Sequence, residues 1–349
     1  MYKKCYNFLK NFLRENLLKI YNKIHTKNKE IYYTMKSTIK SLKCQEKISK
    51  KKTKVRLFAD FMIDKKVKND RLKSCGNYLY FLSNQDKTKF KLSWGNFCNN
   101  RFCPICSWLK AKKNAVEIME LMAFIREKEK KQFIFVTLTA PNVTAENLKN
   151  EIDDFNKSFK RLFQSEDFSV VNKGFIRKLE ITYNSEQNTY HPHFHLIVAV
   201  NDSYFHSRYY ISEKKLLEMW KKAKRDDTIT QVDIRKIEMN TIQEIMEIAT
   251  YSAKQKDLYS NQEVFDVFYE NMRGRQLLTF NGLFKEYRKL QSKNQLNIDE
   301  LDINIDAIKV NAVLEVGYKW KIKEYQEQYE RLLEEWEQRY FYDFDIDID

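Results

Sequence analysis

The chain has 349 residues, of which 43% are hydrophobic and 14% aromatic, and it contains only six glycines and three prolines. This composition excludes a fibrous or low-complexity chain, and it is sufficient to bury the core of one large domain or two modest ones. The formal net charge is +15 at pH 7. A basic balance of this size favours a polyanionic partner, above all nucleic acid.

The charge is spread unevenly and divides the chain into segments. Residues 1–70 hold 20 Lys and Arg against 6 Asp and Glu, whereas residues 291–349 hold 7 against 15. We therefore expect a basic N-terminal extension over 1–70, a Cys-rich segment over 71–115, the main domain over 130–290 and an acidic helical tail over 291–349. The sequence shows no signal peptide and no run of 18 apolar residues, so we expect a cytoplasmic protein without membrane association.

Four of the six cysteines predict a structural zinc site. They are Cys75 and the three cysteines of the run Cys98-Asn-Asn-Arg-Phe-Cys103-Pro-Ile-Cys106. A Cys-x-x-Cys turn directs two thiolates at one metal, and two further cysteines complete a tetrahedral Cys₄ site. Zinc is favoured over a disulfide in a reducing cytoplasm, with ordinary free thiols as the alternative. The basic residues around this cluster are candidates for binding DNA phosphates: Arg101, Lys110, Lys112 and Lys113.

Apolar patterning predicts the secondary structure of the main domain. We expect strands at 131–139, 175–183, 192–200 and 228–237. We expect helices at 144–164, 212–222, 241–256 and 262–273, a loop and helix at 274–290, and a long charged helix at 313–340. A polar turn at 184–189 predicts an antiparallel hairpin. The fold class is α+β: a central antiparallel sheet flanked by helices, preceded by a small Cys₄ segment and followed by a charged C-terminal helix.

Three of the five histidines lie in residues 190–200, Tyr-His-Pro-His-Phe-His-Leu-Ile-Val-Ala-Val. On a strand, His193 and His195 point to the same face, and two imidazoles form half of a divalent-metal site. Glu180 lies across the expected hairpin and is a candidate third ligand, in a set that suits Mg²⁺ or Mn²⁺. His191 is either a further ligand or a turn residue. The alternative is a hydrogen-bonded histidine pair beside a solvent-facing glutamate.

The helix expected at 241–256 carries a candidate nucleophile. Its apolar stripe leaves Glu247, Tyr251 and Lys254 together on the opposite face. A tyrosine can attack a phosphate that a metal has polarised, while Lys254 lowers the cost of the phenolate and Glu247 activates water. Because the chain has 21 tyrosines, a tyrosine near a lysine indicates little by itself. The three residues become a candidate active site only together with the histidine strand.

These motifs together resemble the HUH endonuclease superfamily and, more closely, the replication initiators of rolling-circle plasmids. The similar segments are Phe-Val-Thr-Leu-Thr at 135–139, His-Pro-His-Phe-His at 191–195 and Glu-Ile-Ala-Thr-Tyr-Ser-Ala-Lys at 247–254, between the cysteine run at 98–106 and the segment 274–284. The resemblance implies an HUH-like central sheet and DNA nicking by Tyr251. This nicking leaves a 5′-phosphotyrosine and a 3′-OH primer, with Mn²⁺ or Mg²⁺ held by His193, His195 and Glu180. Glu247 would direct water in the terminating cleavage, as in the single-tyrosine type.

The resemblance also implies origin DNA as the substrate, in double-stranded and in single-stranded hairpin form. Because the sequence has no Gly-x-x-x-x-Gly-Lys-Ser/Thr motif, a host helicase and a replication polymerase are expected partners. The alternatives are a conjugative relaxase or single-strand transposase of the same superfamily, a DNA-binding regulator that does not cleave, and a zinc hydrolase that uses the three clustered histidines.

Overall fold

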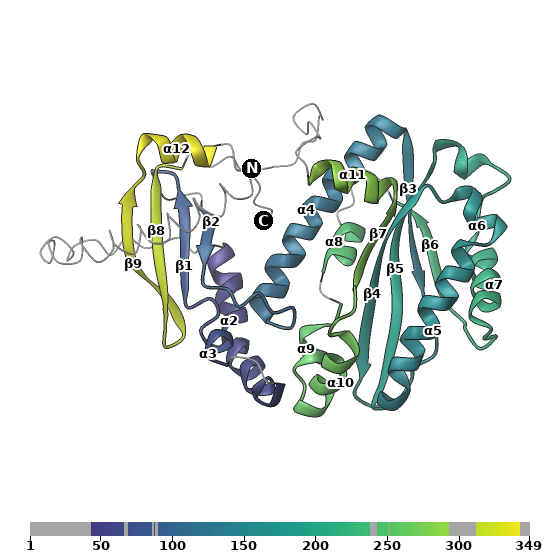
Figure 1. Cartoon of the computed structure of the whole chain (residues 1–349), viewed down its shortest axis with the longest axis horizontal. Helices are drawn as coiled ribbons and strands as arrows, with labels where there is room; N and C mark the ends of the chain where they lie inside the picture. Colours follow the sequence, from purple (N-terminus) through teal and green to yellow (C-terminus); the bar gives the residue numbers. More distant parts are fainter. Residues whose placement is uncertain are drawn as a thin grey trace, which may run out of the picture. The chain divides into compact units, whose positions relative to one another are not determined.

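The fold belongs to the α+β class, as the sequence predicts, but it contains two antiparallel sheets with helices packed against them where the sequence predicts one (Figure 1). It is seen in a computed structural model that describes residues 43–65, 69–85, 87, 90–237, 243–250, 252–292 and 312–342.

The larger sheet has five strands in the order β6-β3-β5-β4-β7. These strands are β3 (Lys131–Leu138), β4 (Gly174–Asn184), β5 (Thr189–Asn201), β6 (Val232–Lys236) and β7 (Leu278–Gly282). β4 and β5 form the predicted hairpin, and their register places Glu180 directly opposite His193. β5 is central, and residues 192–200 are all buried, as expected for a strand with helices on both faces of the sheet.

Side chains alternate along these strands, so each strand contributes residues to two separate hydrophobic cores, one on each face of the sheet. Phe133, Phe135 and Ile197 point to one face, which is packed against α4 (Pro104–Glu129), α8 (Gln243–Ala249) and α11 (Leu283–Gln291). Ile134 and Val136 point to the other face, which is packed against α5 (Ala145–Phe163) and α7 (Glu213–Lys224). Helices thus cover both faces, and Figure 1 shows α4 and α5 on opposite sides of this sheet.

The helices begin where the sequence supplies capping groups. The hydroxyl of Ser212 accepts a hydrogen bond from the Lys215 amide at the start of α7, and the Asn261 side chain accepts one from the Val264 amide at the start of α10. Pro104 occupies the first turn of α4, where its missing N–H costs nothing. The shorter elements are α6 (Glu166–Val171), η2 (Asp202–His206), α9 (Gln255–Leu258) and α10 (Gln262–Met272).

The smaller sheet has four strands in the order β2-β1-β8-β9. They are β1 (Tyr78–Ser83), β2 (Phe90–Gly95), β8 (Leu314–Lys321) and β9 (Glu324–Leu332), accompanied by α2 (Lys43–Phe61), η1 (Ile63–Lys65), α3 (Asn69–Lys73) and α12 (Glu335–Tyr342). Phe81 of β1 packs its ring edge-on against Tyr318 of β8, and both belong to the core that also contains Phe58 of α2. The Cys-rich segment therefore shares a sheet with the C-terminal part of the chain.

The long charged helix predicted at 313–340 is wrong. Strands β8 and β9 occupy most of it, and only α12 is helical. Leu314, Val316 and Tyr318 are buried at every second position, which is the period of a strand. The high content of Glu and Lys favours a helix locally, but pairing with β1 and burial of this apolar face override that preference.

Two further predictions needed correction. The helix expected at 241–256 ends at Ala249, and α9 begins only at Gln255, with residues 238–242 and Tyr251 outside the described residues. The Ser252 carbonyl accepts a hydrogen bond from the Ile181 amide of β4 (2.9 Å), so the backbone there pairs with the sheet instead of continuing the helix. The segment 278–282, expected as part of a loop and helix, is strand β7 beside β4.

Candidate metal centre and active site

Three predicted ligands converge on the α4 side of the five-stranded sheet. Glu180 of β4 faces His193 of β5 across the hairpin, and His195 follows on the same face. One ligand atom from each of the three residues lies within 4.8 Å of the other two, and His195 Nε2 is 3.6 Å from Glu180 Oε2. All three side chains are buried. Two imidazoles and one carboxylate in this arrangement are able to hold one divalent cation and leave further coordination positions open.

The Nδ1 atom of each of these two imidazoles has its own polar contact. His193 Nδ1 lies 3.2 Å from the His191 carbonyl oxygen, to which it donates in the tautomer that leaves Nε2 free. His195 Nδ1 lies 3.2 Å from both Glu247 Oε1 and Thr137 Oγ1. Outer partners of this kind fix the tautomer and orientation of metal-binding histidines.

Burial keeps both histidines in the neutral form that binds metals. Desolvation lowers the pKa of His193 to about 4 and, with the nearby positive charges of Lys178 and Arg235, lowers the pKa of His195 to about 2. Neither ring is protonated at neutral pH, so no proton has to leave before coordination. The donor set therefore fits a divalent cation.

Lys178 is a residue of this site that sequence reasoning did not assign. Its side chain is 1% exposed, and its Nζ donates to Glu180 Oε2 (2.7 Å), the Glu247 carbonyl (2.6 Å) and Thr250 Oγ1 (3.1 Å). It shares an alternation face with Glu180 on β4, and a lysine on the buried face of a strand is the feature that indicates it. Burial lowers the pKa of the Lys178 ammonium group. Lys178 thus joins the metal-ligand carboxylate to the end of α8.

The predicted catalytic residues are distributed differently from the expected single helix face. Glu247 lies on α8 with its carboxylate between His195 and Arg235 (3.9 Å), and burial raises the pKa of Glu247. Lys254 precedes α9 in an extended conformation. Tyr251 lies outside the described residues, but Thr250 and Ser252 on either side of it are both hydrogen-bonded to β4.

The metal-ligand candidates lie in the wall of a cavity of about 760 Å³. The cavity is also lined by His191, Glu247, Thr250 and Lys254. Its other walls are formed by residues of α2, β3, β4, α4 and α9. His191 stacks on His193 with ring centroids 5.2 Å apart, but it is not part of the group whose ligand atoms converge. Sequence reasoning also missed Thr137, although it is in the 135–139 motif, and the wall residues contributed from outside the motifs: Lys51, Ser107 and Trp108.

The four predicted cysteines also come together. Cys75 precedes β1, Cys98 follows β2, and Cys103 and Cys106 lie at the start of α4. Their Sγ atoms lie within 4.8 Å of one another, with three pairs at 3.6 Å, and none forms a disulfide. Tetrahedral zinc with Zn–S bonds of about 2.3 Å places its sulfurs about 3.8 Å apart. The cysteines are thus positioned to hold one metal ion between the small sheet and α4.

A family model described as "Replication protein" matches residues 89–330 of the chain. The chain belongs to this replication protein family. A "Protein rep" from Staphylococcus aureus is 42% identical over 220 residues, which cover 62% of this chain and 96% of the relative. Proteins of the same name from Streptococcus pneumoniae and a Bacillus species are 34% and 32% identical over 66% and 70% of this chain, and over 74% and 85% of their own lengths. No solved structure matches the chain.

Membership in the replication protein family confirms the resemblance to rolling-circle plasmid initiators, which act on origin DNA. The matched range 89–330 contains the cysteine run at 98–106, the histidine strand and strand β8, whereas Cys75 precedes it. Within the described residues, no helix is long and apolar enough to cross a membrane.

The four basic residues predicted to bind DNA differ from one another in their contacts and exposure. Arg101 donates from one guanidinium nitrogen to the carbonyls of Met272 (3.0 Å) and Arg275 (2.8 Å), so it holds the turn after α10 in place. The ammonium group of Lys112 lies 4.7 Å from the centre of the Trp108 ring, beside the cavity. Lys110 and Lys113 are exposed on α4.

Proposed function

We propose that this replication protein starts rolling-circle replication of a plasmid by nicking one strand at the double-strand origin. The observation that carries the proposal is the convergence of Glu180, His193 and His195 in a cavity that Thr250 also lines. Thr250 immediately precedes Tyr251 in the sequence and is hydrogen-bonded to Lys178, the lysine that holds Glu180. The ligand group and the segment that carries the candidate nucleophile are therefore tied to the same strand.

Each step of the reaction has a candidate residue. Glu180, His193 and His195 would hold Mn²⁺ or Mg²⁺, with His191 as a further candidate ligand, and the bound cation would make the scissile phosphate more electrophilic. The Tyr251 oxygen attacks phosphorus, and the bond to the 3′ oxygen breaks. The products are a tyrosine joined to the 5′-phosphate and a free 3′-OH that primes synthesis. The proton of the phenol is lost as the 3′ oxygen gains one, and Lys254 favours the phenolate.

Glu247 has two proposed roles. Its carboxylate orients His195 from 3.2 Å, which keeps Nε2 of that ring available for the cation. In the terminating cleavage it accepts a proton from an attacking water, a role for which a carboxylate with a pKa raised by burial is suited. Rejoining to a 3′-OH is the other route by which the covalent intermediate is resolved.

The remaining proposals concern the structural metal, the binding partners and the cellular compartment. Cys75, Cys98, Cys103 and Cys106 would hold structural Zn²⁺. Phosphate contacts from the basic residues near the cysteines would be non-specific and sensitive to salt. We propose that the protein acts in the cytoplasm and recruits a host helicase and a polymerase.

The test is a nicking reaction with Mn²⁺ and an origin oligonucleotide labelled at either the 5′ or the 3′ end. A denaturing gel should show a protein-sized adduct that carries only the 3′ label, and Tyr251→Phe should abolish it. Tyr210→Phe, at a tyrosine that is 49% exposed and absent from the cavity lining, is the matched control and should retain the adduct. Cleavage without an adduct would instead support a hydrolase, and binding without cleavage a regulator, and either result contradicts the proposal.

A further inference from the structure

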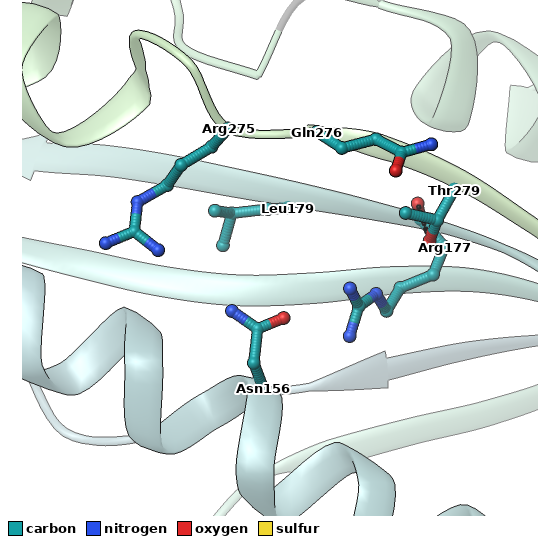
Figure 2. Close-up of a pocket in the computed structure, with 6 residues that line it drawn as sticks. All are labelled: Asn156, Arg177, Leu179, Arg275, Gln276 and Thr279. Atoms are coloured by element: carbon teal, nitrogen blue, oxygen red, sulfur yellow. Dashed lines mark hydrogen bonds between the residues drawn. The ribbon is translucent and has the colours of Figure 1, made fainter.

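A second pocket lies on the face of the five-stranded sheet opposite the metal-ligand group. Side chains alternate along β4, so Lys178 and Glu180 lie on the face that carries that group, while Arg177 and Leu179 face α5. The pocket has a volume of about 240 Å³ (Figure 2). Its walls come from α5, β4, β7 and the segment before β7: Asn156, Arg177, Leu179, Arg275, Gln276 and Thr279.

Arg177 in this pocket is a cation without an anionic partner. Its guanidinium lies against two aromatic rings that are nearly perpendicular to each other, 4.5 Å from the centre of Phe159 and 4.3 Å from the centre of Phe194. Burial lowers the pKa of Arg177 to about 10, so the group stays protonated at neutral pH. Among the residues that the structure describes, no carboxylate pairs with this guanidinium and no acceptor takes a hydrogen bond from it.

The two rings account for the position of Arg177 but not for its hydrogen-bonding groups. A guanidinium carries five N–H donors, and contact with ring faces gives none of them an oxygen acceptor. A desolvated charge without a partner is costly, and its donors here are directed into the pocket. Figure 2 shows the Arg177 guanidinium extending toward the Asn156 amide, with the Arg275 guanidinium on the other side of Asn156.

Arg275 supplies a second guanidinium to the pocket, and an ion pair with α5 holds it in place. Its Nη1 donates to Asp153 at 2.6 Å, and Asp153 lies one helical turn before Asn156 on α5. Gln276 makes no side-chain hydrogen bond to any described residue, so its amide is available to a ligand. Two guanidinium groups and two side-chain amides therefore surround one small space.

We propose that this pocket binds a single phosphate group. The planar N–H fork of arginine matches phosphate oxygens in geometry, and the negative charge would pair with the unpartnered Arg177. The volume lies below the roughly 300 Å³ at which pockets for whole small molecules begin, so it suits one group and not a complete nucleotide. The phosphate belongs either to the backbone of bound DNA or to a free anion. The inference does not rest on the proposed nicking reaction, because the pocket is on the other face of the sheet.

The test compares thermal unfolding of the full chain and of Arg177→Met during titration with inorganic phosphate, at constant ionic strength and without added divalent cations. Methionine keeps an unbranched apolar side chain against the two rings and removes the charge. At a phosphate concentration ten times the Kd, the folded-to-unfolded ratio of the wild type should rise about 11-fold, whereas that of R177M should not change. Equal responses of the two proteins would overturn the proposal and leave Arg177 with a purely structural role.

Two further variants keep the test decisive. Arg288 also stacks on a ring, that of Phe280 at 4.1 Å, but it is paired with Glu117 at 2.6 Å. Arg288→Met should therefore retain the full phosphate response. If R177M does not fold, Arg177→Lys replaces it: a lysine keeps the charge without the planar fork, so the phosphate Kd should rise, and an unchanged Kd would contradict the proposal.

The source of the phosphate is decided with a single-stranded oligonucleotide that has no terminal phosphate. If the pocket binds the DNA backbone, this oligonucleotide stabilises the wild type more than R177M, and inorganic phosphate competes with it. If the pocket binds a free anion, the oligonucleotide stabilises both proteins equally and only inorganic phosphate distinguishes them.

Discussion

Replacing Lys178 by methionine should strongly destabilise the metal-free protein. The variant keeps the length of the side chain but removes an ammonium group that donates three hydrogen bonds, to Glu180, to the Glu247 carbonyl and to Thr250. Both partners of the Lys178–Glu180 pair are buried, so the substitution leaves an uncompensated carboxylate. Breaking a buried pair in this way costs about 3–5 kcal/mol. At about 2 °C per kcal/mol for a protein of this size, the midpoint of thermal unfolding should fall by about 6–10 °C.

Divalent cations should reverse part of this loss. Lys178 Nζ lies 2.7 Å from the same Glu180 oxygen that lies 3.6 Å from His195 Nε2, so the lysine and a bound cation compete for one carboxylate. Removing the lysine should therefore increase the affinity for Mn²⁺. The assay is thermal unfolding of both proteins in EDTA and across a Mn²⁺ titration. Mn²⁺ should raise the unfolding midpoint of K178M more than that of the wild type.

The control for K178M is Lys215→Met, which removes an exposed lysine paired with Asp167 at 2.7 Å. An exposed pair contributes at most about 1 kcal/mol, so this variant should unfold close to the wild type. The reasoning is refuted if K178M in EDTA is as stable as K215M, or if Mn²⁺ stabilises K178M less than the wild type.

Three other predictions follow from the two ligand groups and the small sheet. Cys103→Ser combined with Cys106→Ser should release about one zinc per chain and destabilise the fold, and metal analysis that finds no zinc in anaerobically purified wild type would contradict this. Ending the chain at residue 311 removes β8 and β9, exposes Phe81 and should make the Cys-rich segment sensitive to protease; unchanged protection would count against it. In EDTA, stability should fall as the pH is lowered from 7 to 4, because a histidine with a pKa near 6.5 binds its proton in the unfolded chain first, whereas folded His193 has a pKa of about 4. His193 accounts for about 3 kcal/mol of this loss, and His195, with a folded pKa of about 2, adds to it. His193→Gln should therefore make the profile less steep, and an unchanged slope would refute the assignment.

The features that depend only on neighbouring residues follow from the amino-acid sequence. The hairpin β4–β5 follows from two β-prone runs and the short polar turn between them, and a period of two is enough to place His193 and His195 on one face. The four cysteines were found because thiolates at zinc-binding spacing are rare outside metal sites. The α+β class likewise follows from the order of strands and helices.

The pairing of distant segments, by contrast, depends on how the whole chain folds. β8 pairs with β1 across more than two hundred residues of sequence, and a local preference of a Glu- and Lys-rich segment for helix carries no information about such a partner. The break between α8 and α9 depends in the same way on a hydrogen bond from Ile181 to the Ser252 carbonyl. The burial of Lys178 and the approach of Glu247 to His195 likewise arise where β4, β5 and α8 come together. Because desolvation and charge pairing depend on the atoms that surround a group in space, spacing along the chain could not predict them.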